Sequence, residues 1–299
     1  MIKKVLLTIK PINFLLIVLT YFLGIGIAHY LGFPQKDIAL WNGLILIIAF
    51  YSGSTFLSKY FELYFSTNYN NFHDVRSNPD KFQQEQSIRI VFLLIGVAFL
   101  AVCVIPLLSL ILNNYLRIIN LILIALTFFI ICMVEIFPIQ VSNSGLLEFL
   151  QALFFANLIP AIAFSLQSNS FHRLLFLLTF PLFFLFFAFF IVMSLPKIEK
   201  KRDTKDHSLV SRIGPILSLR IHNLLILLAY LILLSGSLLD LPWKLIWPVL
   251  ITLPIGLIQI WQVNQILKGY KPSFTPLIFT AMATAGFAAY FMMLSMWLN

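Results

Sequence analysis

A polar segment, Ser66–Ser87, carries side chains that could hold a metal ion in an otherwise apolar chain. Asp74 is four residues from both Asn70 and Asn78, so on a helix the three side chains lie on one face. Carboxylate and amide oxygens are ligands of the kind that a hard cation such as magnesium requires. The segment therefore has the composition of a ligand-binding surface, although an ordinary solvated loop has the same composition.

A second polar segment, Lys197–Gly214, presents ammonium groups instead. Lys197 and Lys201 are also four residues apart and share a helical face, whereas Glu199 lies about 200° around the helix from Lys197. Ammonium groups contact phosphate as point charges. Because the connections elsewhere in the chain are short, the two polar segments together predict one shared site.

The elements that must position these segments are apolar helices. The chain is 61% hydrophobic and 10% charged, with a mean hydropathy of +0.97, which is far from the composition of a soluble domain. Apolar runs of about 18 or more residues predict bilayer-spanning helices, because lipid cannot hydrogen-bond a bare backbone. We expect an all-α, single-domain membrane protein over residues 1–299 with nine transmembrane helices. The predicted spans are Pro11–Leu31, Ile38–Phe65, Ile88–Leu112, Leu116–Phe137, Leu146–Leu166, Leu174–Leu195, Pro215–Ser237, Leu245–Leu267 and Pro276–Leu298.

The distribution of basic residues predicts the orientation of these spans. With the N-terminus in the cytoplasm, 16 of the 20 lysines and arginines fall on the cytoplasmic side, as positive charge does in membrane proteins. Both polar segments then face the cytoplasm, and Asn299 lies on the opposite side. No cleaved signal is expected at Met1–Lys10, because no small-residue cleavage site follows it.

Several function classes find no support in the sequence. A nucleic-acid partner is not expected, because no basic run interleaved with aromatic residues occurs outside the short loops between spans. Cys103 and Cys132 stand alone in separate spans, so we expect packing residues rather than metal ligands. We expect the phenylalanines crowded into Phe171–Phe190 to face lipid for the most part. No HExxH, Walker A, GxSxG or haem-attachment pattern is present.

At three places the chain resembles the UbiA superfamily of intramembrane aromatic prenyltransferases. Asn70 to Asp74, followed by Asn78, is similar to the first aspartate-rich motif of that family, after its second helix. The stretch from Phe137-Pro138 to Gly145-Leu146-Leu147-Glu148 resembles the segment before its fifth helix. The third stretch, from Ser194 to Gly214, is similar to the second aspartate-rich motif and the Leu-x-x-Arg-x-Gly ending that follows it.

This resemblance implies a nine-helix bundle, a magnesium cofactor, an isoprenoid diphosphate and an aromatic acceptor as substrates, and a site at the cytoplasmic mouth. Within the matched motifs it implies Asp74 and Asn78 as metal ligands and Asn70, Asn71, Glu148 and Arg212 as substrate-binding residues. Asn71 and Asn78 stand where the family has acids. Lys197 and Lys201 replace both aspartates of the second motif, and an ammonium cannot ligate a cation while it is protonated.

Three interpretations of the lysines stay open. Transfer is lost while the fold is kept, or the ammonium groups contact the diphosphate directly, or Glu199 and Asp203 take over as ligands in a shifted register. The last requires that the segment is not helical, because two residues turn the helical face by roughly 200°.

Charged and polar residues inside the spans are further candidates, because burying them in lipid is costly. Glu135, near the inner end of the fourth span, could face a cavity. We expect Lys59 and Glu62 to form an interfacial ion pair and His222 to be packed or hydrogen-bonded rather than to act as a base.

The resemblance thus implies a UbiA-type homologue that transfers a polyprenyl group from an allylic diphosphate to an aromatic acceptor, with Asp74, Lys197 and Lys201 as catalytic residues. A non-catalytic isoprenoid-binding protein, or a structural subunit of a larger membrane complex, is the alternative. A transporter is less favoured, because no internal repeat or pair of broken helices is evident.

Overall fold

The computed structural model describes residues 11–74, 79–136, 145–200, 208–239, 241–271 and 273–299, and for 65–74, 79–85, 136 and 197–200 it describes the backbone alone. The described chain is helical throughout, in agreement with the all-α prediction. The helices are α2 (Pro11–Tyr30), α3 (Asp37–Asp74), α4 (Pro79–Val102), α5 (Val104–Leu112), α6 (Ile118–Ile131), η1 (Cys132–Ile136), α8 (Leu147–Leu153), η2 (Phe154–Leu158), α9 (Ile159–Ser168), α10 (Arg173–Lys200), α11 (Leu209–Ile213), α12 (Pro215–Ser235), η3 (Gly236–Leu239), α13 (Trp243–Leu250), α14 (Leu253–Leu267) and α15 (Phe274–Leu298).

The helices of the described chain have the length and composition of a multi-pass membrane protein. Eight stretches are long and apolar enough to cross a membrane, and α13 with α14 make a ninth if this pair, bent by 41°, is counted as one span. Each of these stretches begins and ends within two residues of a predicted span. The hydropathy of the sequence therefore predicted the positions of the spans, although α3 continues to Asp74 and α4 begins at Pro79, beyond the predicted limits Phe65 and Ile88.

Prolines explain where two of the spans are interrupted. Pro106 has no N–H to give to the carbonyl of Val102, and the long helix breaks between α4 and α5 at Cys103. Pro254 lies in the first turn of α14, where its missing N–H costs nothing, and the bend from α13 occurs just before it. Neither interruption affects the apolar character of the span, so hydropathy alone did not predict it.

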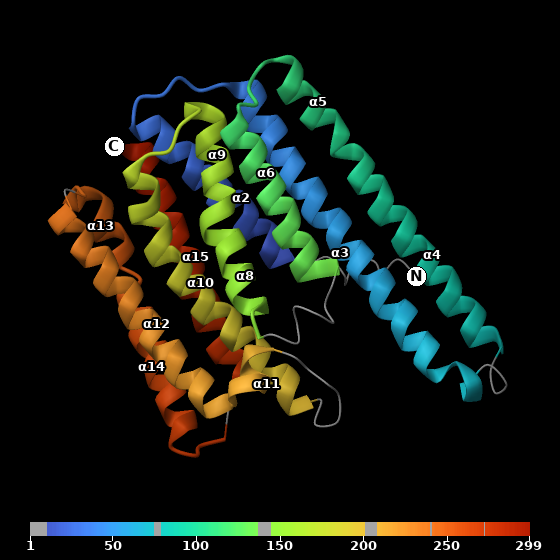
Figure 1. Ribbon diagram of the computed structural model, residues 1–299. Coiled ribbons are helices and arrows are strands. Elements are labelled where there is room, and N and C mark those ends of the chain that lie inside the picture. Colours follow the sequence, from blue (N-terminus) through green and yellow to red (C-terminus); the bar gives the residue numbers. More distant parts are fainter. Residues whose placement is uncertain (1–10, 75–78, 137–144, 201–207, 240, 272) are drawn as a thin grey trace.

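Figure 1 shows a central bundle of helices and a pair of helices that extends away from it. α2, α9, α10 and α15 pack at the centre of one large apolar core, whereas the lower halves of α3 and α4 extend to one side of it. The extended part of this helix pair has a small apolar cluster of its own, formed by Phe56, Ile88 and Phe92. We call the end of the bundle that carries α11 the inner end and the opposite end the outer end.

The expectation that the phenylalanines of α10 face lipid is wrong for the second half of that helix. Phe186, Phe189 and Phe190 are buried, while Phe176 and Phe180 are exposed. α10 lies between α8, α12 and α15, so neighbouring helices cover most of its sides. Composition does not distinguish a phenylalanine that faces lipid from one that faces another helix, because both environments are apolar.

Close helix packing in the core depends on a glycine of α2. A Cβ atom added at Gly24 would lie 2.3 Å from the carbonyl oxygen of Pro160 in α9. The two backbones therefore approach more closely than any other residue would permit, as small residues allow between membrane helices.

Candidate functional site

Helix α11 at the inner end has a start and an end that its sequence dictates. Ser208 caps the helix, with its hydroxyl oxygen accepting a hydrogen bond from the backbone N–H of Ser211 at 3.2 Å. Gly214 follows the helix with a φ of 86°, a conformation that favours glycine, and Pro215 then opens α12. The Ser-Leu-x-x-Arg-x-Gly sequence thus encodes a short capped helix, a turn and the start of the next helix.

Glu148 joins this helix to the segment that precedes α8. Its side chain is only 2% exposed, and Oε2 accepts a hydrogen bond from the backbone N–H of Leu209 at 3.1 Å. Oε1 is also buried and has no hydrogen-bond partner among the described residues. A buried carboxylate oxygen without a donor is costly, and such groups are characteristic of sites that bind a ligand.

Arg212 lies against the same segment. Gly145 has a φ of 71°, and a Cβ atom added there would lie 3.3 Å from Cδ of Arg212 and 3.4 Å from Cα of Leu209. Two of the three segments on which the family resemblance depends, the one that contains Gly145 and Glu148 and the one that contains Arg212, are therefore in contact, although about 60 residues separate them in the chain.

The residues predicted around Asp74 are placed only in part. Asn70, Asn71 and Asp74 belong to α3, so the stretch from Ser66 to Asp74, interpreted from the sequence as part of a loop, is helical instead. Helical geometry puts Asn70 and Asp74 on one face of α3. The side chains of all three lie outside the described part, as does the whole of Asn78.

Of the predicted lysines, Lys197 belongs to the last turn of α10, with its side chain outside the described part, and Lys201 lies outside it entirely. Figure 1 shows that the end of α3, which Asp74 closes, lies apart from the end of α10. The contact between Glu148 and α11 is thus present, whereas the two ends that carry Asp74 and Lys197 are not together.

No group of three or more histidine, cysteine, aspartate or glutamate side chains suited to a metal ion occurs among the described residues. The predicted magnesium ligands, Asp74 and Asn78, are not among the side chains described. The residue types that the resemblance assigns to the metal fit magnesium poorly, because one carboxylate and amide oxygens would have to hold the ion, and lysines replace the carboxylates of the second motif.

A polar cluster inside the spans was only partly predicted. Glu135, which is 9% exposed, lines a small internal cavity of about 10 Å³ together with Tyr51 and Gln151. The amide of Asn13 donates a hydrogen bond to the hydroxyl of Tyr51, which lines this cavity with Glu135. The cavity has about the volume that one water molecule requires. The sequence indicated Glu135 as an intramembrane carboxylate, but no local pattern connected it with Asn13 or Tyr51.

Two π-helical turns border this cavity. η1 contributes Glu135, and η2 contributes Phe154 and Phe155. π-helical turns are rare and frequently occur at functional sites. Pro160 follows η2 and cannot donate to the carbonyl of Ala156, which is a physical reason for the irregular ladder there.

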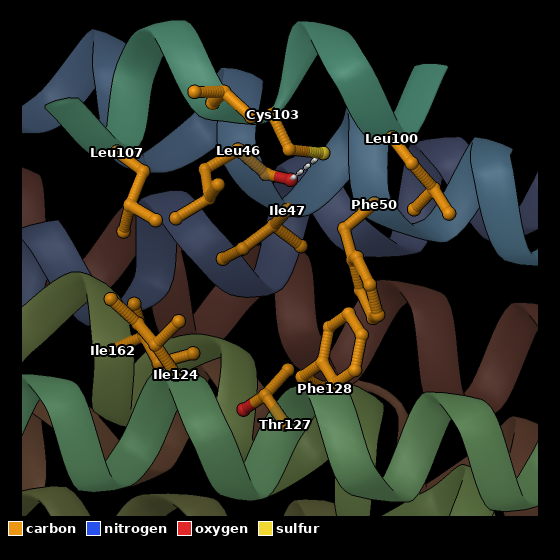
Figure 2. Close-up of a pocket in the computed structure, with 11 residues that line it drawn as sticks. Leu46, Ile47, Phe50, Leu100, Cys103, Leu107, Ile124, Thr127, Phe128 and Ile162 are labelled. Atoms are coloured by element: carbon orange, nitrogen blue, oxygen red, sulfur yellow. Dashed lines mark hydrogen bonds between the residues drawn. The ribbon is translucent and has the colours of Figure 1, made fainter. Parts of the chain in front are cut away.

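A larger, apolar cavity of about 320 Å³ lies between α3, α4, α5, α6 and α9 (Figure 2). The rings of Phe50 and Phe128 form one of its walls, with their centroids 4.3 Å apart. Thr127 and Cys103 are the polar or polarisable side chains in the lining, and the Thr127 hydroxyl is buried with no hydrogen-bond partner in the described chain. The volume and lining suit an apolar ligand or part of a lipid chain. The remaining lining residues are Leu46, Ile47, Leu100, Val104, Leu107, Ile124 and Ile162.

A third set of buried polar groups connects α12, α14 and α15. Gln259 donates a hydrogen bond to Nε2 of His222 at 2.7 Å and accepts one from Thr284 at 3.1 Å. The other ring nitrogen of His222 donates to the side chain of Asn223 at 3.1 Å, so both nitrogens are used. The prediction that His222 is packed and hydrogen-bonded is confirmed.

Comparison of the chain with models of known protein families gave no match, and comparison with curated protein sequences likewise gave none.

Proposed function

We propose that this chain is a UbiA-type prenyltransferase homologue with nine membrane spans, the bent pair α13–α14 counting as one. Its reaction is the transfer of a polyprenyl group from an allylic diphosphate to an aromatic acceptor. Its site is at the inner end, and that end faces the cytoplasm. Three observations support the proposal: the sequence resemblance in three segments, the eight or nine apolar helices, and the contact between two of the three segments.

The observation that carries the proposal is the hydrogen bond from Leu209 to Glu148. This bond fixes α11 against the start of α8, and the other carboxylate oxygen is buried without a partner in the part of the chain that the structure describes. It also places the Arg212 side chain next to Gly145 at the mouth of the bundle. A guanidinium is a suitable group for a diphosphate, since its planar fork matches two phosphate oxygens.

In the proposed reaction the bond between the allylic carbon and the diphosphate oxygen breaks, and the electron pair leaves with the diphosphate. Lys197, Lys201 and Arg212 stabilise the negative charge that develops on this leaving group. The aromatic ring of the acceptor captures the allylic cation and then loses a proton. Because the donor set fits magnesium poorly, the ammonium groups supply the positive charge that a metal ion supplies in the family.

In this proposal the end of α3 closes on the diphosphate site. Asp74, with Asn70, Asn71 and Asn78, approaches the end of α10 when diphosphate is bound. The separate apolar cluster of Phe56, Ile88 and Phe92 allows the lower part of the α3–α4 pair to move as a unit without opening the main core.

The test is transfer from labelled farnesyl diphosphate in membranes, with and without magnesium. The wild type is compared with the double variants Lys197→Gln/Lys201→Gln and Lys197→Asp/Lys201→Asp. Turnover without magnesium in the wild type, lost in the glutamine variant, is the expected result. Lys268→Gln, at an exposed position between α14 and α15, is the matched control and is expected to retain activity.

A second candidate is a non-catalytic isoprenoid-binding protein, alone or as a subunit of a membrane complex. The apolar cavity of Figure 2 favours it, because this cavity can hold a lipid chain without any reaction at the inner end. Activity that appears only in the double aspartate variant, together with binding of farnesyl diphosphate by the wild type, would assign this second function.

A further inference from the structure

Three connections between helices meet at the outer end of the bundle (Figure 1). The backbone N–H of Lys36 donates to the side chain of Gln167 at 2.8 Å, which ties the α2–α3 connection to the end of α9. Asn120, a fully buried residue of α6, donates to the carbonyl of Tyr115 at 2.9 Å and to Oδ1 of Asn169 at 3.3 Å. These hydrogen bonds hold the three connections in a fixed arrangement.

Two cations lie within this arrangement without a counter-ion. The ammonium of Lys36 donates to the carbonyl of Gln167 at 2.7 Å and lies 5.8 Å from the centre of the Tyr115 ring. Arg117 immediately precedes α6, makes no capping hydrogen bond with its side chain, and is exposed. In the described part of the chain neither cation forms an ion pair, not even with Asp37, which follows Lys36.

The two positive charges belong to neighbouring connections, because Arg117 is two residues from Tyr115, whose ring centre lies 5.8 Å from the Lys36 ammonium. Partial burial is the main cause of a lowered pKa at Lys36, and the positive charge of Arg117 lowers this pKa further. Holding like charges together is unfavourable, whereas an anion between them would remove the repulsion and gain an attraction from both. A phosphate group fits, because Arg117 can bind two of its oxygens and Lys36 can act as a point charge.

The position of the two cations indicates the source of the phosphate. Lys36 comes immediately before the span that begins at Asp37, and Arg117 immediately before the span that begins at Ile118. Both therefore stand at the level where lipid headgroups meet the hydrocarbon. Trp41 and Ile118 are exposed on the first turns of these spans, where lipid chains would cover them, and Tyr115 has the amphipathic ring typical of that level.

We propose that Lys36 and Arg117 form a binding site for the phosphate of an anionic membrane lipid at the outer end of the bundle. The lipid chains run along the exposed apolar side chains of α3 and α6. This site is separate from the proposed prenyl-transfer site at the inner end and does not depend on it.

Native mass spectrometry of the full chain, with phosphatidylglycerol added to a neutral detergent, measures the binding. Replacing both cations, Lys36→Gln/Arg117→Gln, is expected to weaken binding of one phosphatidylglycerol by about fivefold for each charge removed. Lys244→Gln, which removes a different exposed cation of the outer end, is the matched control and is expected to leave that binding unchanged. Equal binding by the double variant, or equal weakening by the control, would overturn the proposal.

Two further measurements complete the test. One distinguishes a lipid phosphate from a free phosphate ion, and the other uses a conservative variant so that misfolding is not mistaken for lost binding. Inorganic phosphate at the same concentration is expected to leave the thermal unfolding temperature in detergent unchanged, whereas phosphatidylglycerol raises it; an equal rise with inorganic phosphate would identify a free-anion site instead. Arg117→Lys keeps the charge but loses the two-point contact, so its affinity is expected to lie between those of the wild type and the double variant. An affinity for Arg117→Lys below that of the double variant would contradict the assignment.

Discussion

Two regions inside the spans bury polar side chains, and they differ in how these side chains are paired. In the network of α12, α14 and α15, Gln259 connects His222 with Thr284, and each group has a partner at hydrogen-bond distance. In the cluster of α2, α3 and η1, Tyr51 is paired with Asn13, but Glu135 lies at a small cavity and makes no hydrogen bond within the described part of the chain.

We expect this difference in pairing to separate side chains that stabilise the fold from side chains that bind water or a ligand. A satisfied network holds three helices together, since lipid offers no alternative partners to the same groups. An intramembrane carboxylate beside a cavity gains nothing for packing and has a cost in stability, which is the situation expected where a water molecule or a ligand group binds. Variants in the two regions should therefore affect different properties.

The largest expected effect is that of Gln259→Leu. This change leaves Nε2 of His222 without a donor and Thr284 without its acceptor on Gln259, both at buried positions. We expect a loss of about 2 kcal/mol in the free energy of unfolding, measured by titration with sodium dodecyl sulfate in mixed micelles. Gln265→Leu on the same helix is the control and should change stability by less than about 0.5 kcal/mol. Similar values for both variants would show that the network is not structural.

Glu148→Ala is expected to have the next largest effect, at the inner end. It removes the acceptor of the Leu209 N–H, which should cost about 1–2 kcal/mol and increase hydrogen exchange in α11. Glu148→Gln keeps an acceptor oxygen at the same place, so α11 should stay protected from exchange. If the alanine variant protects α11 as well as the wild type does, the contact between the two segments does not stabilise the mouth.

Glu135→Gln should change the free energy of unfolding by less than about 0.5 kcal/mol, because the carboxylate has no hydrogen bond in the described part of the chain to lose. Its expected effect is on turnover of farnesyl diphosphate or on retention of a bound lipid, either of which should fall. A stability loss as large as that of Gln259→Leu would remove the distinction between the two regions.

The smallest effect is expected for Lys59→Ala. Lys59 and Glu62 form an ion pair of 2.7 Å, as the sequence predicted, but their side chains are 38% and 64% exposed. Such pairs contribute about 0.3–0.5 kcal/mol, and salt screens them. Unfolding titrations at low and high salt should therefore differ little between this variant and the wild type, and a loss above about 1 kcal/mol would contradict this assignment.

The sequence predicted those parts of the structure that depend on hydropathy and local spacing. The positions of the spans, the helical turn that joins Lys59 to Glu62, and the hydrogen-bonded state of His222 belong to this group. Pro106 is a signal from which the break at Cys103 could have been predicted. Many membrane helices contain proline without breaking, however, so the proline alone does not decide.

The rest depends on contacts between distant segments. Nothing local to Glu148 indicates that Leu209 is its donor, and nothing local to Asn13 indicates Tyr51, because tertiary packing brings these residues together. The buried phenylalanines of α10 show the same limit, since hydropathy is equal on a lipid-facing and a helix-facing side.

The central claim is that the ends of α3 and α10 meet around a diphosphate. Spin labels on Phe72→Cys in α3 and Glu199→Cys in α10, in a chain with Cys103→Ala and Cys132→Ala, measure the distance between these ends in bilayers by electron paramagnetic resonance. We predict that the distance shortens when farnesyl diphosphate is added. An unchanged, long distance at saturating farnesyl diphosphate would contradict the proposed site.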